Sequence, residues 1–97
     1  MKKIKIAILG FGQRGFVYAN IIKEFPDEME LVSVCEINLL KKPLIMHQFS
    51  IKAENYFTDY KEMFKKGKLA DILIIATQDR DHYEQAMAAL DLGYDLL

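Results

Sequence analysis

The sequence predicts an α/β protein built on a doubly wound parallel sheet, and three observations predict it. Short apolar segments rich in β-branched residues alternate with segments of helical periodicity, which favours parallel strands joined by right-handed crossovers. A glycine-rich turn directly follows the first apolar segment. The 97 residues are 52% hydrophobic and 28% charged, which is typical of one small folded domain rather than a disordered chain.

The first strand is predicted at residues 4–9, which are largely apolar and β-branched, as in a strand covered on both faces. After the turn at 10–15, the pattern changes to helical spacing over 16–25. The stripe expected to face the sheet consists of Val17, Ile21 and Phe25, with Tyr18 and Ile22 beside it. Pro26 ends this helix, because the residue before a proline disfavours the α conformation.

The later elements continue the alternation of strands and helices. They are a strand at 31–35, a short helix at 43–49 with Pro43 in its first turn, a strand at 55–57, a helix from Asp59 to Gly67, a strand at 72–76, a helix from Asp81 to Gly93 and the start of a fifth strand at 94–97. Both longer helices open with a capping-box pattern, Asp59 with Glu62 and Asp81 with Glu84. The apolar residues expected to be buried are Tyr60, Met63 and Phe64 in the first, and Tyr83, Ala86, Met87 and Leu90 in the second.

Composition excludes several classes of function. The formal net charge of −1 argues against nucleic acid as the main partner. No apolar run approaches the roughly 18–20 residues that cross a bilayer, and the N-terminus does not resemble a signal peptide. A single cysteine, Cys35, excludes an internal disulfide and fits a reducing compartment. We therefore expect a cytoplasmic protein with no metal site, no membrane partner and no nucleic-acid partner.

The glycine-rich turn carries the main functional prediction. Gly10-Phe11-Gly12-Gln13-Arg14-Gly15 matches G-x-G-x-x-G, a weak signal that gains weight because it joins a strand to a helix. Gly10 permits the tight turn, Gly12 lets the backbone approach a pyrophosphate, and Gly15 lets the helix pack closely. The helix N-terminus favours the anion, with Gln13 contributing its backbone N–H. Arg14 either adds charge there or is simply solvated, and the alternative for the whole motif is a turn that binds nothing.

An acidic residue follows the second strand at the position where such a carboxylate accepts hydrogen bonds from the adenosine ribose. Glu36 lies 21 residues after Gly15. A carboxylate repels a ribose phosphate, and the next residue is Ile37 rather than arginine, so NAD is favoured over NADP. Lys41 and Lys42 in the same loop soften that preference. The alternative is that Glu36 only begins the loop.

The end of the fourth strand supplies further candidates. Ligands bind at the carboxyl ends of strands in doubly wound sheets, so Thr77 and Gln78 are expected to border the cofactor. His82 either orients a ribose or nicotinamide group or is solvated. Cys35 is expected to be a small core residue rather than a reactive thiol, and Tyr56 and Phe57 are expected to pack under the sheet.

These blocks, in this order and over nearly the whole chain, resemble the N-terminal domain of the glucose–fructose oxidoreductase, inositol dehydrogenase and MocA family. The resemblance rests on residues 7–15, on Val34-Cys35-Glu36, on Tyr56-Phe57-Thr58-Asp59-Tyr60, on residues 70–77, and on His82, residues 86–90 and 93–97. Two departures are Gln78-Asp79, where the family usually has proline and asparagine, and Pro43 within a normally continuous helix.

The resemblance implies a Rossmann-type domain of an NAD(P)-dependent oxidoreductase that acts on a sugar-like or cyclitol hydroxyl. It also implies a catalytic glutamate-lysine-proline motif just beyond the last residue. Because the sequence stops inside an apolar run, we expect residues 1–97 to be a fragment truncated near the fifth strand, inactive alone and without the substrate domain. The alternatives are an NAD-sensing regulatory module without catalysis and an NAD-dependent glycosidase of the same family. An exposed edge strand would favour self-association.

Overall fold

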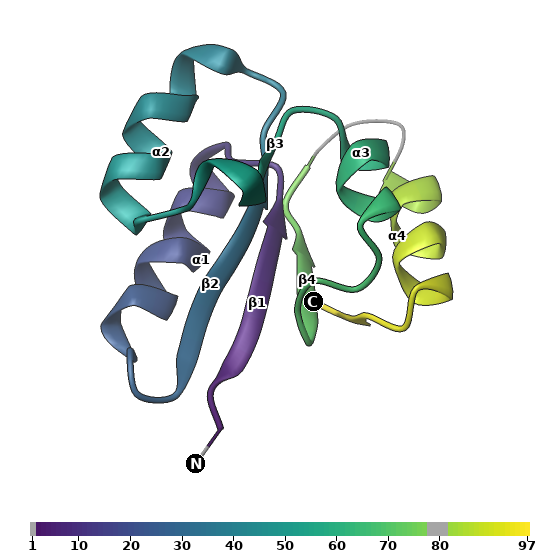
Figure 1. The fold of residues 1–97 in the computed structure, drawn as a ribbon, viewed down its shortest axis with the longest axis horizontal. Coiled ribbons are helices and arrows are strands. Elements are labelled where there is room, and N and C mark those ends of the chain that lie inside the picture. The colour runs from purple at the N-terminus through teal and green to yellow at the C-terminus, as the bar shows by residue number, and fades with distance from the viewer. Residues whose placement is uncertain (1, 78–81) are drawn as a thin grey trace.

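A computed structural model of the chain describes residues 2–77 and 82–97, and it contains a five-stranded parallel sheet (Figure 1). The elements are β1 (Ile4–Leu9), α1 (Gln13–Glu24), β2 (Met29–Cys35), α2 (Lys42–Phe49), β3 (Tyr56–Phe57), α3 (Tyr60–Lys65), β4 (Ile72–Ile75), α4 (His82–Asp91) and β5 (Asp95–Leu96). Short 3-10 helices at Leu39–Lys41 and Ala53–Asn55 precede α2 and β3.

The strand order β3-β2-β1-β4-β5 confirms the predicted doubly wound sheet. The chain starts in the centre, moves outward through β2 to β3, then crosses back to β4 on the other side of β1. The order therefore reverses between β1 and β4, and a crevice opens at the carboxyl ends of strands at such a switch point. All neighbouring strands pair in parallel, with one irregularity in the register of β1 against β2, between Ile6 and Ala7.

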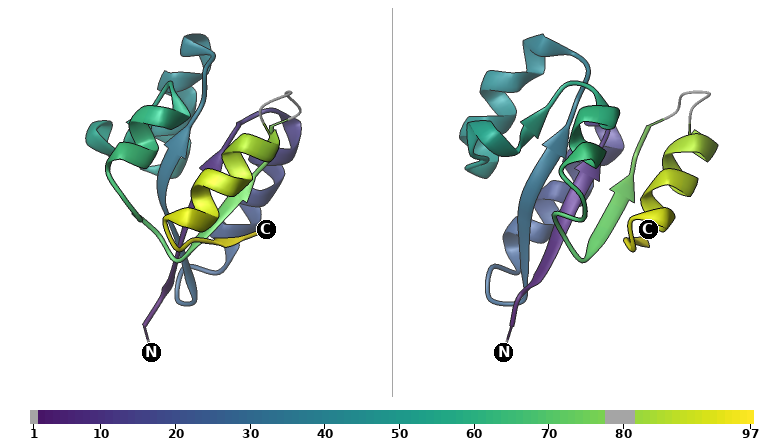
Figure 2. Two further views of the ribbon diagram at one scale, coloured as in Figure 1. Left: turned by 90° about the vertical axis from the view of Figure 1, so that its right-hand side faces the viewer. Right: turned by 45° about the vertical axis from the view of Figure 1, so that its right-hand side comes forward.

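The helices lie in two layers, with α1 and α2 on one side of the sheet and α3 and α4 on the other (Figure 1). Alternate residues of β1 supply both cores: Ile6 and Ile8 pack toward the first layer, and Ala7 and Leu9 toward the second. Figure 2 shows α4 alongside β4 from two directions. In the first layer, the N-terminus of α1 thus closely follows the central strand β1.

The predicted buried stripe of α1 is wrong. Val17, Ile21 and Phe25 are all exposed, Val17 to 53%, whereas Gly15, Ala19 and Ile22 face the sheet. The small side chains at 15 and 19 let the helix axis approach the strands closely, so they occupy the contact although larger apolar residues lie elsewhere on the helix. Periodicity located the helix correctly but misplaced the centre of its buried face, although Ile22, expected beside the stripe, is buried and Tyr18 is partly buried.

The same error recurs in α4. Of the four residues predicted to be buried, Tyr83, Met87 and Leu90 are exposed and Ala86 is partly buried. The buried residues of this helix are Gln85 and Ala89. A buried glutamine is not expected from apolar periodicity, because an amide must be hydrogen-bonded when it leaves water. Its partner is described with the site below.

The start of α1 and the burial and capping of α3 agree only partly with the predictions. Helix α1 begins at Gln13, within the glycine motif. Met63 is fully buried in α3 as predicted, whereas Tyr60 and Phe64 are half-buried. The Asp59 side chain caps α3 by accepting from the Lys61 N–H at 2.9 Å, but the carboxylate of Glu62 pairs with Lys65 at 3.2 Å instead of completing a capping box. Asp81 lies outside the described residues.

Candidate functional site

The three glycines of the turn have different surroundings. Gly10 has φ +94°, and a Cβ there would lie 2.6 Å from Thr77 Cγ2 and 2.9 Å from the Thr77 backbone nitrogen. A Cβ on Gly15 would collide with the Gly10 carbonyl oxygen. At Gly12, by contrast, no described atom lies within 4 Å of the Cβ position. Gly10 and Gly15 therefore close the turn against its neighbours, and Gly12 leaves open space above it.

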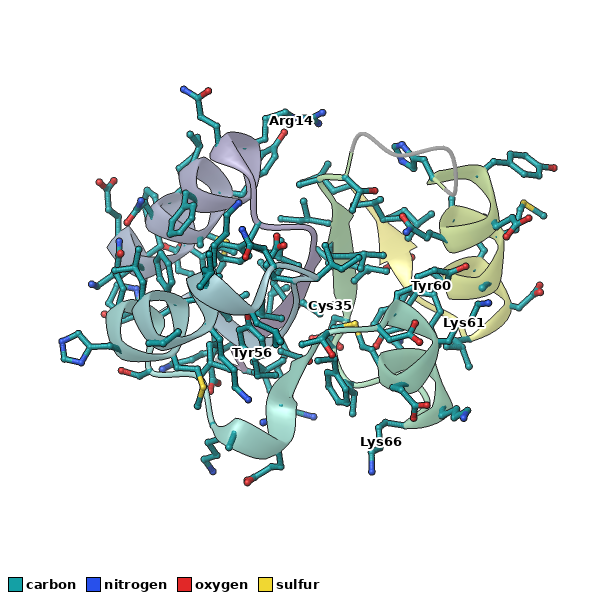
Figure 3. All side chains as sticks on the ribbon, turned by 90° about the horizontal axis from the view of Figure 1, so that it is seen from above. Arg14, Cys35, Tyr56, Tyr60, Lys61 and Lys66 are labelled. Atoms are coloured by element: carbon teal, nitrogen blue, oxygen red, sulfur yellow. The ribbon has the colours of Figure 1, made fainter. Side chains whose placement is uncertain are left out.

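That open space lies at the N-terminus of α1. Gly12 is the N-cap residue, and in the part of the chain that the structure describes no side chain caps the helix and no acid occupies its first turn. The first N–H groups of a helix lack intrahelical partners and carry the positive end of its dipole, so this end favours an anion. Gln13 and Arg14 are exposed there, and Arg14 lies at the outer edge of the molecule in Figure 3.

Phe11 anchors the turn through its side chain. The ring is fully buried and packs edge-on against Phe16 at 4.9 Å between centroids, with Phe49 at 5.7 Å. Only the Phe11 backbone therefore faces the candidate site. Both of its backbone polar groups are held by side chains from the segment after β2.

Glu36 binds one of these two groups, the Phe11 N–H. The residue is 6% exposed, its Oε1 accepts from the Phe11 N–H and its Oε2 accepts from the Asn38 N–H, each at 2.7 Å. Charge-assisted bonds of this length are strong and fix the carboxylate at the carboxyl end of β2. Each oxygen retains acceptor capacity for a further donor.

Lys41 binds the other group, the Phe11 carbonyl oxygen. Its Nζ donates to the Phe11 carbonyl oxygen at 3.0 Å, across 30 residues of sequence. The sequence placed Lys41 in the right loop, but the contact with the glycine turn was not predicted. A loop lysine gives no periodic signal, so only the path of the 3-10 helix Leu39–Lys41 reveals that this side chain turns back to the site.

Thr77 links the turn after β1 to α4. Its backbone nitrogen and methyl group flank Gly10, and its hydroxyl donates to Gln85 Oε1 at 2.9 Å. Gln85 is only 2% exposed, and the sequence analysis missed it. A polar residue at helical spacing between apolar residues was the available signal. The bond gives the buried amide the partner that it needs.

Two hollows flank Glu36. One, of about 390 Å³, is lined by Gly10, Phe11, Gly12, Gln13, Arg14, Glu36, Lys41 and Ala76. The other, of about 410 Å³, is lined by Leu9, Cys35, Ile37, Thr58, Asp59, Tyr60, Lys61 and Gln85. Both volumes fall in the range of about 300–1,000 Å³ typical of ligand pockets. A third hollow lies away from the glycine turn, between the end of α1, the start of β2 and the end of α2.

The predicted site residues are thus divided between several places. Gly10 to Arg14 and Glu36 meet in one hollow, and Gly15 is buried against the Gly10 carbonyl. Ile37 is 82% exposed in the second hollow. Thr77 adjoins Gly10, whereas His82 is exposed at the start of α4 and lines neither hollow. Gln78 lies outside the described residues.

Cys35 and Tyr56 are core residues. Cys35 is buried at the end of β2 and lies centrally in Figure 3; burial, with the nearby Asp59 and Glu36 carboxylates, raises the pKa of its thiol to about 12. Burial also raises the pKa of Tyr56 to about 12. The thiol is therefore protonated at neutral pH and is not a nucleophile.

Two features are absent from the described residues: a metal-binding cluster and a helix suited to crossing a membrane. Residues 2–77 and 82–97 contain no group of three or more histidine, cysteine or acidic side chains arranged to hold a metal ion. Within the same residues, no helix has the length and apolar character required to cross a membrane.

The switch-point crevice, the glycine turn and the acid after β2 together define a dinucleotide-binding α/β domain. Comparison with known families agrees: a family described as an oxidoreductase family with an NAD-binding Rossmann fold (GFO_IDH_MocA) matches residues 4–97. The chain belongs to this family, that of glucose–fructose oxidoreductase, inositol dehydrogenase and MocA. None of the curated proteins compared with the chain matches it.

Solved structures share the fold. The WlbA dehydrogenase of Bordetella pertussis, in complex with NADH and UDP-GlcNAcA, is 24% identical with a TM-score of 0.84, over 98% of this chain and 28% of that one. The scyllo-inositol dehydrogenase of Lactobacillus casei, with NAD(H) and scyllo-inositol, is 22% identical with a TM-score of 0.85. The myo-inositol 2-dehydrogenase of Lactobacillus plantarum has the same two values. The chain covers 27% of each of the latter two, and 98% of its own length aligns.

Proposed function

We propose that the chain binds NAD across the carboxyl ends of β1 and β2, as the cofactor-binding part of an oxidoreductase that transfers hydride to or from a hydroxyl-bearing carbon of a sugar-like or cyclitol substrate. One observation carries the proposal: the space above Gly12 is open, at a helix end with no side-chain cap among the described residues. The pyrophosphate fits there, because backbone N–H groups point at it and no Cβ obstructs it.

The ribose of the adenosine half is assigned to Glu36. Each carboxylate oxygen accepts one backbone N–H and keeps capacity for one hydroxyl, so a vicinal diol completes its hydrogen bonds. A ribose phosphate in the same place brings a second anion close to this carboxylate. The arrangement therefore favours NAD.

The adenine ring is assigned to the second hollow, where Ile37 provides an apolar surface beside Glu36. Thr77 borders the other end of the cofactor, because it lies against Gly10 at the switch point. When bound, the nicotinamide supplies the hydride acceptor or donor, and these residues supply binding and orientation. We assign no catalytic residue among the described residues, and propose that groups elsewhere in the full-length enzyme complete the hydride transfer.

The substrate class is supported by the structural relatives. The proteins of known structure with this fold include dehydrogenases crystallised with a nucleotide sugar acid and with scyllo-inositol. Both ligands offer secondary hydroxyl groups on a six-membered ring. A full-length protein that contains this chain is therefore expected to reduce NAD in the presence of a cyclitol or a pyranose derivative.

Calorimetric titration of the chain with NAD tests the cofactor assignment. We expect saturable binding by the native chain, loss of most affinity in Gly12→Ala, and an unchanged fold in that variant because the Cβ meets open space. Glu36→Ala should lose more affinity for NAD than for NADP. Equal NAD affinity in the native chain and in Gly12→Ala would contradict the placement of the pyrophosphate.

A further inference from the structure

Gln85 is a buried amide that reaches the second hollow from helix α4. It is only 2% exposed, and it lines this hollow. The Thr77 hydroxyl donates to its Oε1 at 2.9 Å, so the carbonyl end of the amide is occupied. Its Nε2 carries two donors, and in residues 2–77 and 82–97 no acceptor is bonded to them. In the same residues the one polar side-chain atom that is sealed from solvent without a partner is the Tyr56 hydroxyl, so Nε2 reaches accessible space.

Asp59 brings a hydrogen-bond acceptor to the same hollow. The residue lies at the N-cap of α3, and its Oδ1 accepts from the Lys61 N–H at 2.9 Å. Within the described residues its Oδ2 accepts no hydrogen bond. The carboxylate also lies close enough to Cys35, another lining residue, to contribute to the raised pKa of that thiol. The lining of the hollow therefore combines an amide donor with a carboxylate acceptor.

We propose that this pair recognises the amino edge of adenine, with Asp59 accepting from the exocyclic amino group and Gln85 Nε2 donating to a neighbouring ring nitrogen. The inference rests on the proposed function, because it requires the adenine ring to lie in the second hollow. Adenine carries a donor, the amino group, beside ring-nitrogen acceptors, which complements the two protein groups. Leu9 and Ile37 provide apolar surface for the ring.

The proposal makes the site selective between two purine bases. Hypoxanthine has a carbonyl oxygen where adenine has the amino group. In the same position it would place this oxygen against the Asp59 carboxylate, and two acceptors cannot bond to each other. Asp59 and Gln85 are thus specificity-determining residues that favour an adenine dinucleotide over a hypoxanthine dinucleotide.

Asp59→Asn separates base recognition from the fold of α3. Asparagine is as good an N-cap as aspartate, so its Oδ1 keeps the bond to the Lys61 N–H. Its Nδ2 then replaces the free acceptor with a donor, which suits the carbonyl oxygen of hypoxanthine. Glu62→Gln is the matched control, because it removes one negative charge from the same helix. The Glu62 carboxylate pairs with Lys65 at 3.2 Å and does not line the hollow.

The test is calorimetric titration with NAD and with nicotinamide hypoxanthine dinucleotide, which differ only in the base. We expect the native chain to bind NAD about tenfold more tightly, since a hydrogen bond to a charged group is exchanged for a repulsive contact. Asp59→Asn should bring the two affinities within about twofold of each other by the same reasoning. Glu62→Gln should keep the native preference. Circular dichroism of each variant checks that it is folded.

A second variant tests the donor. Gln85→Met removes Nε2 and keeps a side chain of similar length, so NAD affinity should fall by about fivefold for the loss of one neutral hydrogen bond. Affinity for inorganic pyrophosphate, which we place above Gly12, should not change. An equal loss of both affinities would mean that Gln85 acts only by supporting the fold, and would contradict its role in base recognition.

The inference and the proposed function fail in different ways. Equal affinity of the native chain for the two dinucleotides contradicts the inference, while the proposed function survives. A native preference that Asp59→Asn leaves unchanged also contradicts it. Failure of the folded native chain to bind NAD contradicts the proposed function itself, and the inference with it.

Discussion

Two strand-to-helix turns meet at the switch point of the sheet, and they are held in different ways. The turn after β1 is fixed through its backbone: Gly10 and Gly15 permit close contacts, and Glu36 and Lys41 hold the two polar groups of Phe11. The turn after β4 is fixed, in its described part, through one side-chain pair, Thr77 with Gln85. In the proposed function the first turn holds the pyrophosphate through its backbone, and the second turn, held by side chains, lies beside it.

The comparison shows why a backbone site and a side-chain site differ in tolerance. A backbone site depends on the absence of a Cβ, so a side chain disturbs either the fold, as at Gly10 and Gly15, or the proposed ligand binding, as at Gly12. A side-chain site depends on one hydrogen bond, which another pair of residues can replace. The predictions below test this contrast, from the largest expected effect to the smallest.

Cys35, whose backbone is bonded to the first turn, should react slowly with alkylating reagents in the folded chain. The Cys35 carbonyl accepts from the Gly10 N–H at 2.8 Å, and burial raises the pKa of the thiol from 9.0 to about 12. At pH 8 the native thiolate fraction is thus lower than in the unfolded chain by on the order of a thousandfold. The rate of alkylation by iodoacetamide, followed by mass spectrometry, should be lower without urea than with urea by on the order of that factor. Comparable alkylation rates with and without urea would show that the Cys35 thiol is accessible and reactive in the folded chain.

Gly10→Ala should break both turns at once, because Gly10 is where they touch. The substitution puts a Cβ at φ +94° and 2.9 Å from the Thr77 backbone nitrogen. Left-handed strain and overpacking together should lower the free energy of unfolding by on the order of 3 kcal/mol. Urea titration measures this change. Gly12→Ala is the control, and a loss of similar size there would contradict the open space described above Gly12.

Thr77→Val should weaken only the second turn. It leaves the amide of Gln85 buried without its hydroxyl partner, so we expect a loss of about 1–2 kcal/mol in the free energy of unfolding. Thr77→Ser keeps the hydroxyl and should lose less than half of that. Affinity for inorganic pyrophosphate, which we place above Gly12 at the first turn, should be unchanged in both variants. A drop in pyrophosphate affinity in Thr77→Val would mean that the two turns are not separate.

Polar substitutions on the outward stripes of the helices should have the smallest effect. Ile21→Gln in α1 and Leu90→Gln in α4 replace exposed side chains, and each should change the free energy of unfolding by less than about 0.5 kcal/mol. Ile22→Ala, on the buried face of α1, should lower it by about 2–4 kcal/mol. Thermal unfolding followed by circular dichroism distinguishes these cases. A large loss in Ile21→Gln would restore the originally predicted face of α1.

The sequence predicted the order of elements and the glycine turn because both are encoded locally. β-branched runs specify strands, and glycines mark the positions where a Cβ would collide, as at Gly10 and Gly15. The buried helix faces could not be predicted in the same way. Gly15 and Ala19 face the sheet because small residues allow close approach, whereas apolar periodicity counts only the larger side chains of Val17 and Ile21.

The missed parts of the site are tertiary contacts. Gln85 is buried because Thr77 lies opposite it, and Lys41 reaches Phe11 because a 3-10 helix redirects the loop. The spacing of Gln85 among apolar residues suggests that it is buried but does not reveal its partner, and a loop lysine such as Lys41 has no periodic signal. Glu36 was predicted as a ribose ligand from its distance to the turn, but its bond to the Phe11 N–H, which joins the ribose end to the glycine turn, was visible only in the structure.

The most direct measurement is a nuclear magnetic resonance titration of the isotope-labelled chain with ADP, followed through its backbone amides. If the exposed N–H groups at the start of α1 hold the diphosphate, the largest shifts will fall on Gly12, Gln13 and Arg14, and Gly12→Ala will abolish them without altering the rest of the spectrum. Shifts centred instead on the hollow around Pro26 and Phe49, or a spectrum that ADP leaves unchanged, would contradict the account.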